Sequence, residues 1–493
     1  MGIIEKQATR NAIYSYLGAG LGFITILWQS HLFSTDENGL LRILVSVSML
    51  FAQFSNLGFS TVTIKFFPFF KNKDKGHHGF LFYSLIVSVI GFALCYLGFY
   101  LFEDAIIADN LQKSKLFVDY LYYVMPLTFF TLFFFVFDAY LRATFSSVIG
   151  SFTKDLMQRI FILIAIAAYF FKLINFPIFI FWYITSTCLP TLILLFEIIR
   201  IKEWHIKPVK GFIDRKLSME MMSLAVFSIF STFSAAIILS IDVIMVNHKL
   251  GLSETGIYSI AFYFGSMITI PSRAIGRISS TMVAESFKKN DIDEIASIYK
   301  KSSNSLMMIG LLLFICVAIN IDDVMKLLPV NFISGKSVIL IVSAGYVVEL
   351  STGINQLIII NSRYYIYDTA LALITVCLTV MLNNYLIPVY GIKGSAIATA
   401  ATVIFVNILR YGFILWKYNI QPFDLNSFKV IVIAGFSATV GWFIPATHYF
   451  IIDILIKSSV IGGLFVLLML KWEATPELNI KIRKNLKRFS ISI

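Results

Sequence analysis

The chain has 493 residues, of which 58% are hydrophobic and only 14% are charged, and its mean hydropathy is +0.82. Soluble domains carry about 25% charged residues, so this composition excludes a water-soluble globular protein. The formal net charge of +12 does not point to nucleic acid, because the positions of the charges described below attribute it to membrane topology and anionic lipid headgroups.

The apolar runs are continuous and about 20 residues long, which is the length a helix needs to cross a bilayer. Strands of a membrane barrel would be shorter and would alternate in polarity. We therefore expect an all-α polytopic membrane protein with about 14 transmembrane helices. The predicted spans are 11–33, 40–64, 80–102, 119–140, 156–172, 177–199, 220–246, 257–282, 303–320, 338–360, 367–387, 394–416, 428–446 and 454–470. No cleavable signal peptide is expected, because the run at 11–33 is too long for one and lacks a small-residue cleavage site.

The basic residues indicate the orientation of these spans. With the N-terminus in the cytoplasm, 31 of the 40 Lys and Arg residues fall on the cytoplasmic side and 9 on the outer side. Cytoplasmic loops are enriched in Lys and Arg, so both termini are predicted to be cytoplasmic. The protein is then expected to be a multi-pass membrane protein with no large outer domain.

The two halves of the sequence have similar first hairpins. Ser34 to Leu40 and Ser253 to Ile257 each place a Ser and an acidic residue before a glycine that opens the next helix, and the two glycines, Gly39 and Gly256, are 217 positions apart. Such caps and turns favour helix starts. Convergent turn chemistry explains the likeness too, but six predicted spans precede the second of the two hairpins, as in transporters with internal repeats. We predict lobes at 1–200 and 220–417, a basic linker at 201–219, and two further helices with a basic tail at 418–493.

Sequence motifs for nucleotide, cofactor or metal binding are missing. Gly335-Lys336-Ser337 lacks the leading glycine of a phosphate-binding loop, which should lie five residues earlier. The four cysteines lie inside predicted spans and are expected to be small core residues. We expect no cofactor, no metal site and no enzyme activity.

Three segments resemble bacterial polysaccharide flippases, which transport lipid-linked oligosaccharides within the multidrug/oligosaccharidyl-lipid/polysaccharide exporter superfamily. They are Thr35 to Leu40 with Phe54 to Phe59, Asp242 to Met245 with Gly256 to Ala261, and Leu386 to Thr399. The resemblance extends over residues 5–420. It implies two six-helix lobes around a central cavity, often with two additional C-terminal helices.

The resemblance also implies a function. The substrate would be an undecaprenyl-diphosphate-linked oligosaccharide, moved from the cytoplasmic to the outer leaflet for O-antigen or capsule biosynthesis. The acid Glu349 within a predicted span and the missing nucleotide site motivate the hypothesis that an H+ or Na+ gradient drives this transport. A polymerase or ligase of the same pathway would be a partner. Two alternatives stay open: a drug or cation antiporter of the same superfamily, and a membrane polysaccharide polymerase or glycosyltransferase.

A diphosphate inside a membrane protein needs fixed cations, and Arg suits its geometry. Arg273 and Arg277 are four residues apart on one predicted helix face, after Pro271. Lys65 and Arg42 are further candidates, the latter on the outer side. For each of them, an ordinary basic residue near the headgroups is the competing interpretation.

Acids within predicted spans require protonation, pairing or water. Glu349, in the middle of its span, is the predicted ion-coupling or cavity acid. Asp242 is a second candidate. Asp138 is a third, and it is placed to pair with Arg142 four residues later. Tyrosines on the spans expected to line the cavity are candidates for stacking on sugars: Tyr14, Tyr16, Tyr258 and Tyr263.

Overall fold

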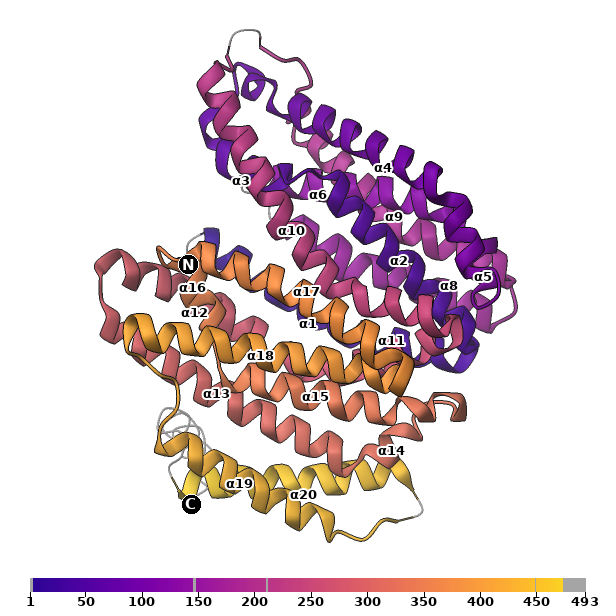
Figure 1. The fold of residues 1–493 in the computed structure, drawn as a ribbon, viewed down its shortest axis with the longest axis vertical. Coiled ribbons are helices and arrows are strands. Elements are labelled where there is room, and N and C mark those ends of the chain that lie inside the picture. Colours follow the sequence, from indigo (N-terminus) through magenta and orange to yellow (C-terminus); the bar gives the residue numbers. More distant parts are fainter. Residues whose placement is uncertain (1–2, 145–147, 210–211, 448, 473–493) are drawn as a thin grey trace. The chain divides into compact units, whose positions relative to one another are not determined.

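The computed structural model describes residues 3–144, 148–209, 212–447 and 449–472. Within these ranges every regular element is a helix, and the chain divides into two compact units, Met1–Ser259 and Ile260–Ile493 (Figure 1). Eleven helical segments of the described residues are long and apolar enough to cross a membrane. The protein is therefore a multi-pass membrane protein, and the all-α prediction is confirmed.

The first unit is built from ten helices and the start of an eleventh. They are α1 (Ile3–Leu32), α2 (Thr35–Ser55), α3 (Phe59–Phe70), α4 (Phe80–Asn110), α5 (Lys115–Asp119), α6 (Val124–Ala143), α7 (Val148–Ser151), α8 (Gln158–Phe170), α9 (Phe176–Arg200), α10 (Arg215–Leu250) and α11 (Leu252–Ser266). Three short segments join them: η1 (Gly76–Gly79), η2 (Leu121–Tyr123) and the π-helical η3 (Phe152–Met157).

The start of α2 has the capping chemistry that the sequence predicts. The Ser34 hydroxyl accepts a hydrogen bond from the Glu37 N–H at 3.2 Å, and the Ser34 N–H donates to the Glu37 carboxylate at 2.8 Å. This reciprocal pair satisfies two backbone donors that a helix start leaves unbonded. It fixes where α2 begins, and α2 then packs against α4, α6 and α10.

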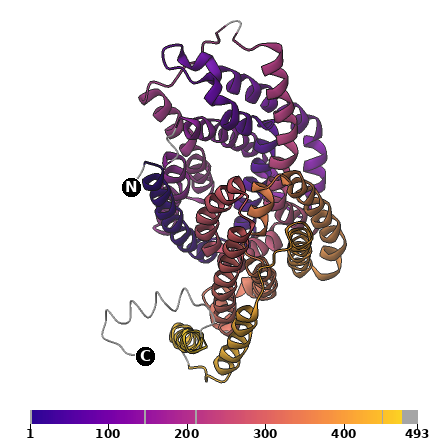
Figure 2. The same ribbon diagram turned by 90° about the vertical axis from the view of Figure 1, so that its left-hand side faces the viewer.

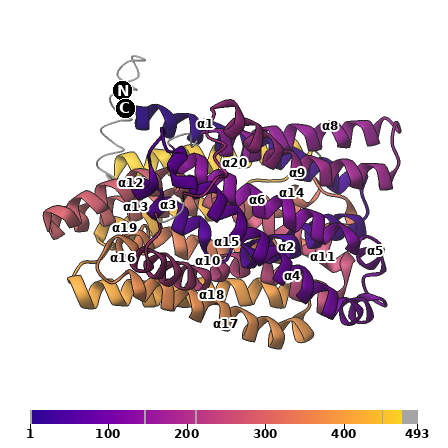
Figure 3. The same ribbon diagram turned by 90° about the horizontal axis from the view of Figure 1, so that it is seen from above.

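The second unit continues with η4 (Met267–Thr269), α12 (Ile270–Lys289), α13 (Ile292–Ile319), α14 (Ile321–Met325), η5 (Val330–Gly335), α15 (Lys336–Ser351), α16 (Asn355–Asn361), α17 (Tyr365–Tyr390), α18 (Ile392–Tyr418), α19 (Leu425–Trp442) and α20 (Phe450–Lys471). Helices α17 and α18 run side by side, which Figure 3 shows from above, and α15 packs on α18 and α13. In Figure 2, α20 is seen nearly end-on beside α19.

Three of the fourteen predicted spans are not among the eleven apolar segments: 11–33, 156–172 and 257–282. The first is helical throughout as part of α1. The second lies on η3 and the short α8, and the third is divided among α11, η4 and α12. Pro271 occupies the first turn of α12, where its missing N–H costs no hydrogen bond. The count of fourteen stays a prediction.

The compact units divide after Ser259 and not within the predicted linker at 201–219. The reason is that α10, predicted to open the second lobe, packs against α2 and α3 of the first unit. The lobe boundaries stay a prediction from the repeat. The basic tail at 473–493 lies outside the described residues.

Ion pairs and hydrogen bonds of two aspartates fix the last two helices of the second unit. Asp323 of α14 binds Lys326 at 2.8 Å and Lys457 of α20 at 3.1 Å. Burial acts to raise the pKa of Asp323, but the hydrogen bonds and charges of these two lysines lower it below 3.8. Asp424 caps α19 through the Ser427 N–H at 2.9 Å. Burial opposes ionisation there too, yet bonds from Ser427 and Lys300 leave the pKa of Asp424 below its ordinary value.

Candidate functional site

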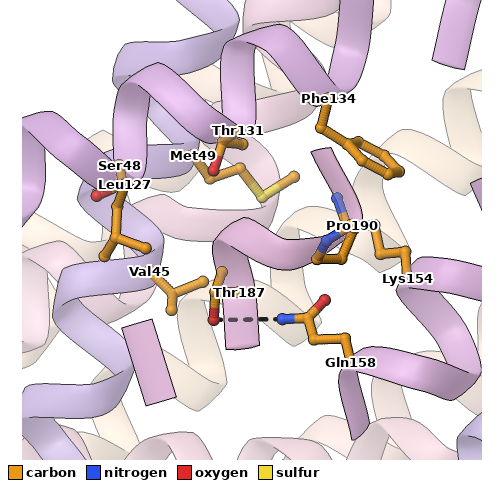
Figure 4. A pocket seen from close by; sticks show the side chains of 10 residues that line it. All are labelled: Val45, Ser48, Met49, Leu127, Thr131, Phe134, Lys154, Gln158, Thr187 and Pro190. Atoms are coloured by element: carbon orange, nitrogen blue, oxygen red, sulfur yellow. Dashed lines mark hydrogen bonds between the residues drawn. The ribbon is translucent and has the colours of Figure 1, made fainter. Parts of the chain in front are cut away.

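A cavity of about 120 Å³ with both polar and apolar lining residues lies within the first unit (Figure 4). Side chains from α2, α6, η3, α8 and α9 surround it. Its lining residues are Val45, Ser48, Met49, Leu127, Thr131, Phe134, Lys154, Gln158, Thr187 and Pro190. Hydroxyl, amide and ammonium groups therefore meet inside a bundle of apolar helices, where a polar group is costly unless it has a role.

Lys154 supplies the positive charge of this cavity. Its Nζ lies 4.5 Å from the ring centroid of Phe134 and 5.3 Å from that of Phe135. A cation over an aromatic face is stabilised by the ring quadrupole. Among the described residues, no carboxylate lies within 4.0 Å of this ammonium group. The ammonium group itself contacts neutral rings, and the charges of Asp138 and Asp155 act on it from farther away.

A π-helical turn places Lys154 beside the cavity. The Thr153 hydroxyl donates to the Ile149 carbonyl at 2.9 Å and to the Gly150 carbonyl at 3.1 Å within this irregular stretch. One residue after Lys154, the Asp155 carboxylate accepts a hydrogen bond from Ser15 of α1 at 3.0 Å. π-Turns inside helices occur often at functional sites. Here the turn and the contact with α1 fix the direction in which Lys154 leaves the backbone.

Two neutral polar groups of the cavity are bonded to each other. The Gln158 side-chain amide donates to the Thr187 hydroxyl at 3.3 Å, the dashed line in Figure 4. Ser48 donates to the Val124 carbonyl at 3.1 Å, which leaves its oxygen as an acceptor. Hydroxyl and amide groups both donate and accept, so this wall can hydrogen-bond the hydroxyls of a sugar.

Asp138 forms the predicted pair with Arg142, at 3.0 Å. Gly150 makes room for this carboxylate, because a Cβ there would lie 3.1 Å from the Asp138 Cγ. The prediction of a helix-face pair is confirmed. Whether Asp138 also serves ion coupling stays a prediction.

The other predicted cation sites are spread over the chain. Lys65 is exposed, with its Nζ 5.9 Å from the Phe66 ring centroid. Arg42 is partly buried on α2, while Arg273 and Arg277 are exposed on α12. None of these four residues lines the cavity with Lys154. Their roles as diphosphate contacts stay proposals.

Asp242 and Tyr258 are bound to each other. Both are buried, and the Tyr258 hydroxyl donates to the Asp242 carboxylate at 3.2 Å. Tyr258 has no exposed surface in this structure, and the stacking of its ring on a sugar stays a prediction. The helix contact that covers it could not be read from the sequence.

The remaining tyrosines differ in exposure. Tyr14 is partly buried with its ring centroid 5.2 Å from that of Phe152, Tyr16 is exposed, and Tyr263 is partly buried. Their stacking on sugars stays a prediction.

Glu349 lines a second cavity, of about 210 Å³, within the second unit. Arg410 of α18 and the amides of Asn355, Gln356 and Asn407 share that cavity. In the described residues no group of three or more His, Cys, Asp or Glu is arranged to hold a metal ion, and the four cysteines are free thiols.

Comparison with known proteins identifies the family. Residues 6–275, more than half of the chain, match the family described as "Polysaccharide biosynthesis protein". The chain belongs to this family. A relative from Haloferax volcanii, named probable low-salt glycan biosynthesis flippase Agl15, is 24% identical over 229 residues. That match covers 45% of this chain and 48% of the relative, so the chain spans about half the length of this curated relative.

Solved transporters share the fold of this polysaccharide biosynthesis protein. The lipid II flippase MurJ in an inward closed conformation has a TM-score of 0.74 and 14% identity, covering 93% of this chain and 98% of that one. An inward-facing multidrug resistance MATE family transporter of the MOP superfamily has a TM-score of 0.66 and 12% identity, covering 82% and 94%. At these identities the likeness concerns the fold alone.

Proposed function

We propose that this protein is a flippase that moves a lipid-linked glycan across the membrane during polysaccharide biosynthesis. The match to the polysaccharide biosynthesis family, and the partial match to a probable glycan biosynthesis flippase, support this proposal. The fold shared with transporters supports it as well. Moving a lipid from one leaflet to the other makes and breaks no covalent bond. In this proposal the protein is therefore a transporter and not an enzyme.

The observation that carries the proposal is the cavity around Lys154. A lipid-linked glycan brings an anionic phosphate linkage and many sugar hydroxyls into the protein while its lipid tail remains in the bilayer. The ammonium group of Lys154 is a compact point charge suited to phosphate. Thr131, Thr187 and Gln158 line the same cavity and offer hydrogen bonds to hydroxyls. A positive charge for the phosphate linkage and hydrogen-bonding groups for the sugar hydroxyls thus line one cavity.

We further propose the identity of the substrate and its route. The carrier is undecaprenyl diphosphate, and the glycan moves from the cytoplasmic to the outer leaflet of a bacterial inner membrane, toward O-antigen or capsule. Both termini are cytoplasmic in this account, and a polymerase or ligase receives the product. Arg42, Lys65, Arg273 and Arg277 are proposed as additional diphosphate contacts along the route.

Reconstitution into liposomes tests this function. The substrates are a fluorescent oligosaccharide on undecaprenyl diphosphate, the same oligosaccharide on undecaprenyl monophosphate, and a small organic cation. We expect the protein to change the leaflet accessibility of the diphosphate-linked lipid. The monophosphate-linked lipid should be translocated more slowly, because it lacks one anionic group. Transport of the cation without movement of either lipid would overturn the proposal in favour of an antiporter, since MATE transporters share the fold.

A further inference from the structure

A break in the helix after Glu349 creates a polar site in the second unit. Helix α15 ends at Ser351 and α16 begins at Asn355, and between them Gly353 has a φ of +65°. A Cβ on Gly353 would lie 2.9 Å from the Cα of Ser303, so α13 approaches the break closely. The Ser303 hydroxyl donates to the Ser351 carbonyl. In transporters, binding sites commonly lie at broken helices. Irregular backbone inside the membrane is tolerated where it lines a cavity, and its unpaired polar groups can bind ions or substrate there.

Amide side chains hold the break open beside the 210 Å³ cavity. The Asn407 side-chain oxygen accepts hydrogen bonds from Thr352 at 3.0 Å and from Asn355 at 2.9 Å. Asn355 and Asn407 are both buried. These hydrogen bonds connect the end of α15, the start of α16 and α18 at the wall of the cavity.

The guanidinium of Arg410 and the carboxylate of Glu349 line this cavity, and the guanidinium is bound to a second carboxylate, Asp368. Arg410 donates to Asp368 through Nε at 3.0 Å and through its terminal nitrogen at 2.9 Å. Gln356 donates to the other Asp368 oxygen at 3.2 Å. The side chains of Arg410 and Asp368 are only 13% and 10% exposed. Asp368 thus accepts both of these bonds on one carboxylate oxygen, while Glu349 lines the cavity together with Arg410.

Glu349 has no comparable partner. Among the described residues, its carboxylate accepts no hydrogen bond and forms no ion pair. Arg410 is the charged group that acts on it. On α13, which also packs against α15, Lys300 is paired with Asp424 at 3.1 Å and Lys301 is exposed.

On α12, which lines the cavity with Ser272 and Gly276, the charged residues Arg273 and Arg277 are exposed. The inner cluster therefore carries one positive charge against two ionisable acids. A net negative charge held inside a membrane protein is costly.

We propose that this cavity is a proton-binding site in which Glu349 takes up one proton and Arg410 senses the change. A proton on Glu349 balances the cluster of Glu349, Asp368 and Arg410, and it leaves Arg410 paired with Asp368, as observed. When Glu349 loses the proton, the two carboxylates compete for one guanidinium, and the contacts of α18 with α15 and α17 change. A metal cation fits less well, because Arg410 repels it. The use of this proton to drive transport rests on the proposed function. The existence of the proton-binding site does not.

Infrared spectroscopy of the purified protein in lipid vesicles tests the proton site without any transport. We expect a carboxylic acid C=O band that persists at a pH well above about 4, where exposed carboxyl groups have already titrated. This band should be absent in Glu349→Gln and retained in Glu349→Asp. The matched control is Asp104→Asn, which removes an exposed acid and should leave the band unchanged. An unchanged band in Glu349→Gln would overturn the proposal.

Translocation under an imposed proton gradient tests the use of the site. For one proton per cycle, a gradient of one pH unit shifts the final distribution of substrate between leaflets by up to about tenfold. We expect this shift in the wild type and in Asp104→Asn, and its loss in Glu349→Gln. Wild-type translocation that responds to sodium instead, or to neither gradient, would overturn the proton proposal and leave the flippase proposal standing. A band lost in Glu349→Gln without any lipid translocation by the wild type would support the proton site and overturn the flippase.

Discussion

The side-chain oxygens of Thr35 and Ser253 lie 2.7 Å apart, although 218 positions separate the two residues. They belong to the first turns of α2 and α11, the two helix starts with similar sequences. One turn further on, the helix backbones meet at glycines: a Cβ on Gly256 would lie 2.9 Å from the Gly39 nitrogen. The two similar hairpins are therefore packed against each other, through residues that only small side chains can replace.

We predict that Gly256→Ala destabilises the protein by about 1–3 kcal/mol, because an added methyl group overpacks the contact with Gly39. The control is Gly98→Ala on α4, where a Cβ meets nothing within 4 Å. That change should be neutral or stabilise the helix by about 0.5–1 kcal/mol. Thermal unfolding in detergent measures both. Equal shifts in the two variants would mean that the glycine contact is not close in solution.

We predict that the stability of the second unit falls in acid because of Asp323. Its pKa is lower in the folded protein than the ordinary 3.8, so its ion pairs contribute stability above that pH. This contribution is lost as the pH falls through the lower, folded value. Asp323→Asn should lower the unfolding temperature at neutral pH and flatten its dependence on pH in the acidic range.

The neighbouring Asp322 provides the control for this experiment. It pairs with Lys336, but its side chain is 76% exposed, and surface pairs contribute about 0–1 kcal/mol. Asp322→Asn should therefore retain the acid dependence of the wild type. If Asp323→Asn keeps the same slope as the wild type, the pairs with Lys326 and Lys457 do not stabilise the fold.

We predict that Tyr258→Phe costs about 1–3 kcal/mol of stability, because a buried carboxylate, Asp242, loses a hydrogen bond. Tyr100→Phe serves as the control, since the Tyr100 ring is 66% exposed and should change stability little. Chemical denaturation of both variants in the same detergent compares them. Tyr258→Phe with full stability would argue that the pair at 3.2 Å is not formed.

The helical fold was predictable because long apolar runs have few alternatives in a membrane. The pair of Asp138 with Arg142 was predictable as well, since it depends on spacing within one helix. Lys154 was not predictable, because in the sequence it is one of several basic residues between the predicted spans 119–140 and 156–172. The π-turn of η3 changes the direction of its side chain, and hydrophobic periodicity carries no signal for such a turn.

Glu349 was identified from its position in an apolar run, but its surroundings were not. Arg410 follows Glu349 by 61 positions and lies near the end of the predicted span 394–416, so the sequence gives no sign that the two residues share a cavity. The predicted span 338–360 was drawn as one helix, whereas the chain breaks at Thr352 to Ile354. The Ser351-Thr352-Gly353 sequence was the available signal for that break, because Gly favours positive φ. Which side chains meet at the break depends on tertiary packing.

The most direct test of the account is the initial rate at which reconstituted protein moves the diphosphate-linked oligosaccharide, compared for wild type, Lys154→Gln and Lys154→Arg. Loss of a charge-assisted hydrogen bond costs about 1.5–3 kcal/mol, so we predict a rate about 10- to 100-fold lower for Lys154→Gln and substantial activity for Lys154→Arg. Lys216→Gln, at an exposed lysine of α10 outside the cavity, should match the wild type. A Lys154→Gln variant that folds and translocates at the wild-type rate would contradict the central claim that this cavity binds the anionic part of the substrate.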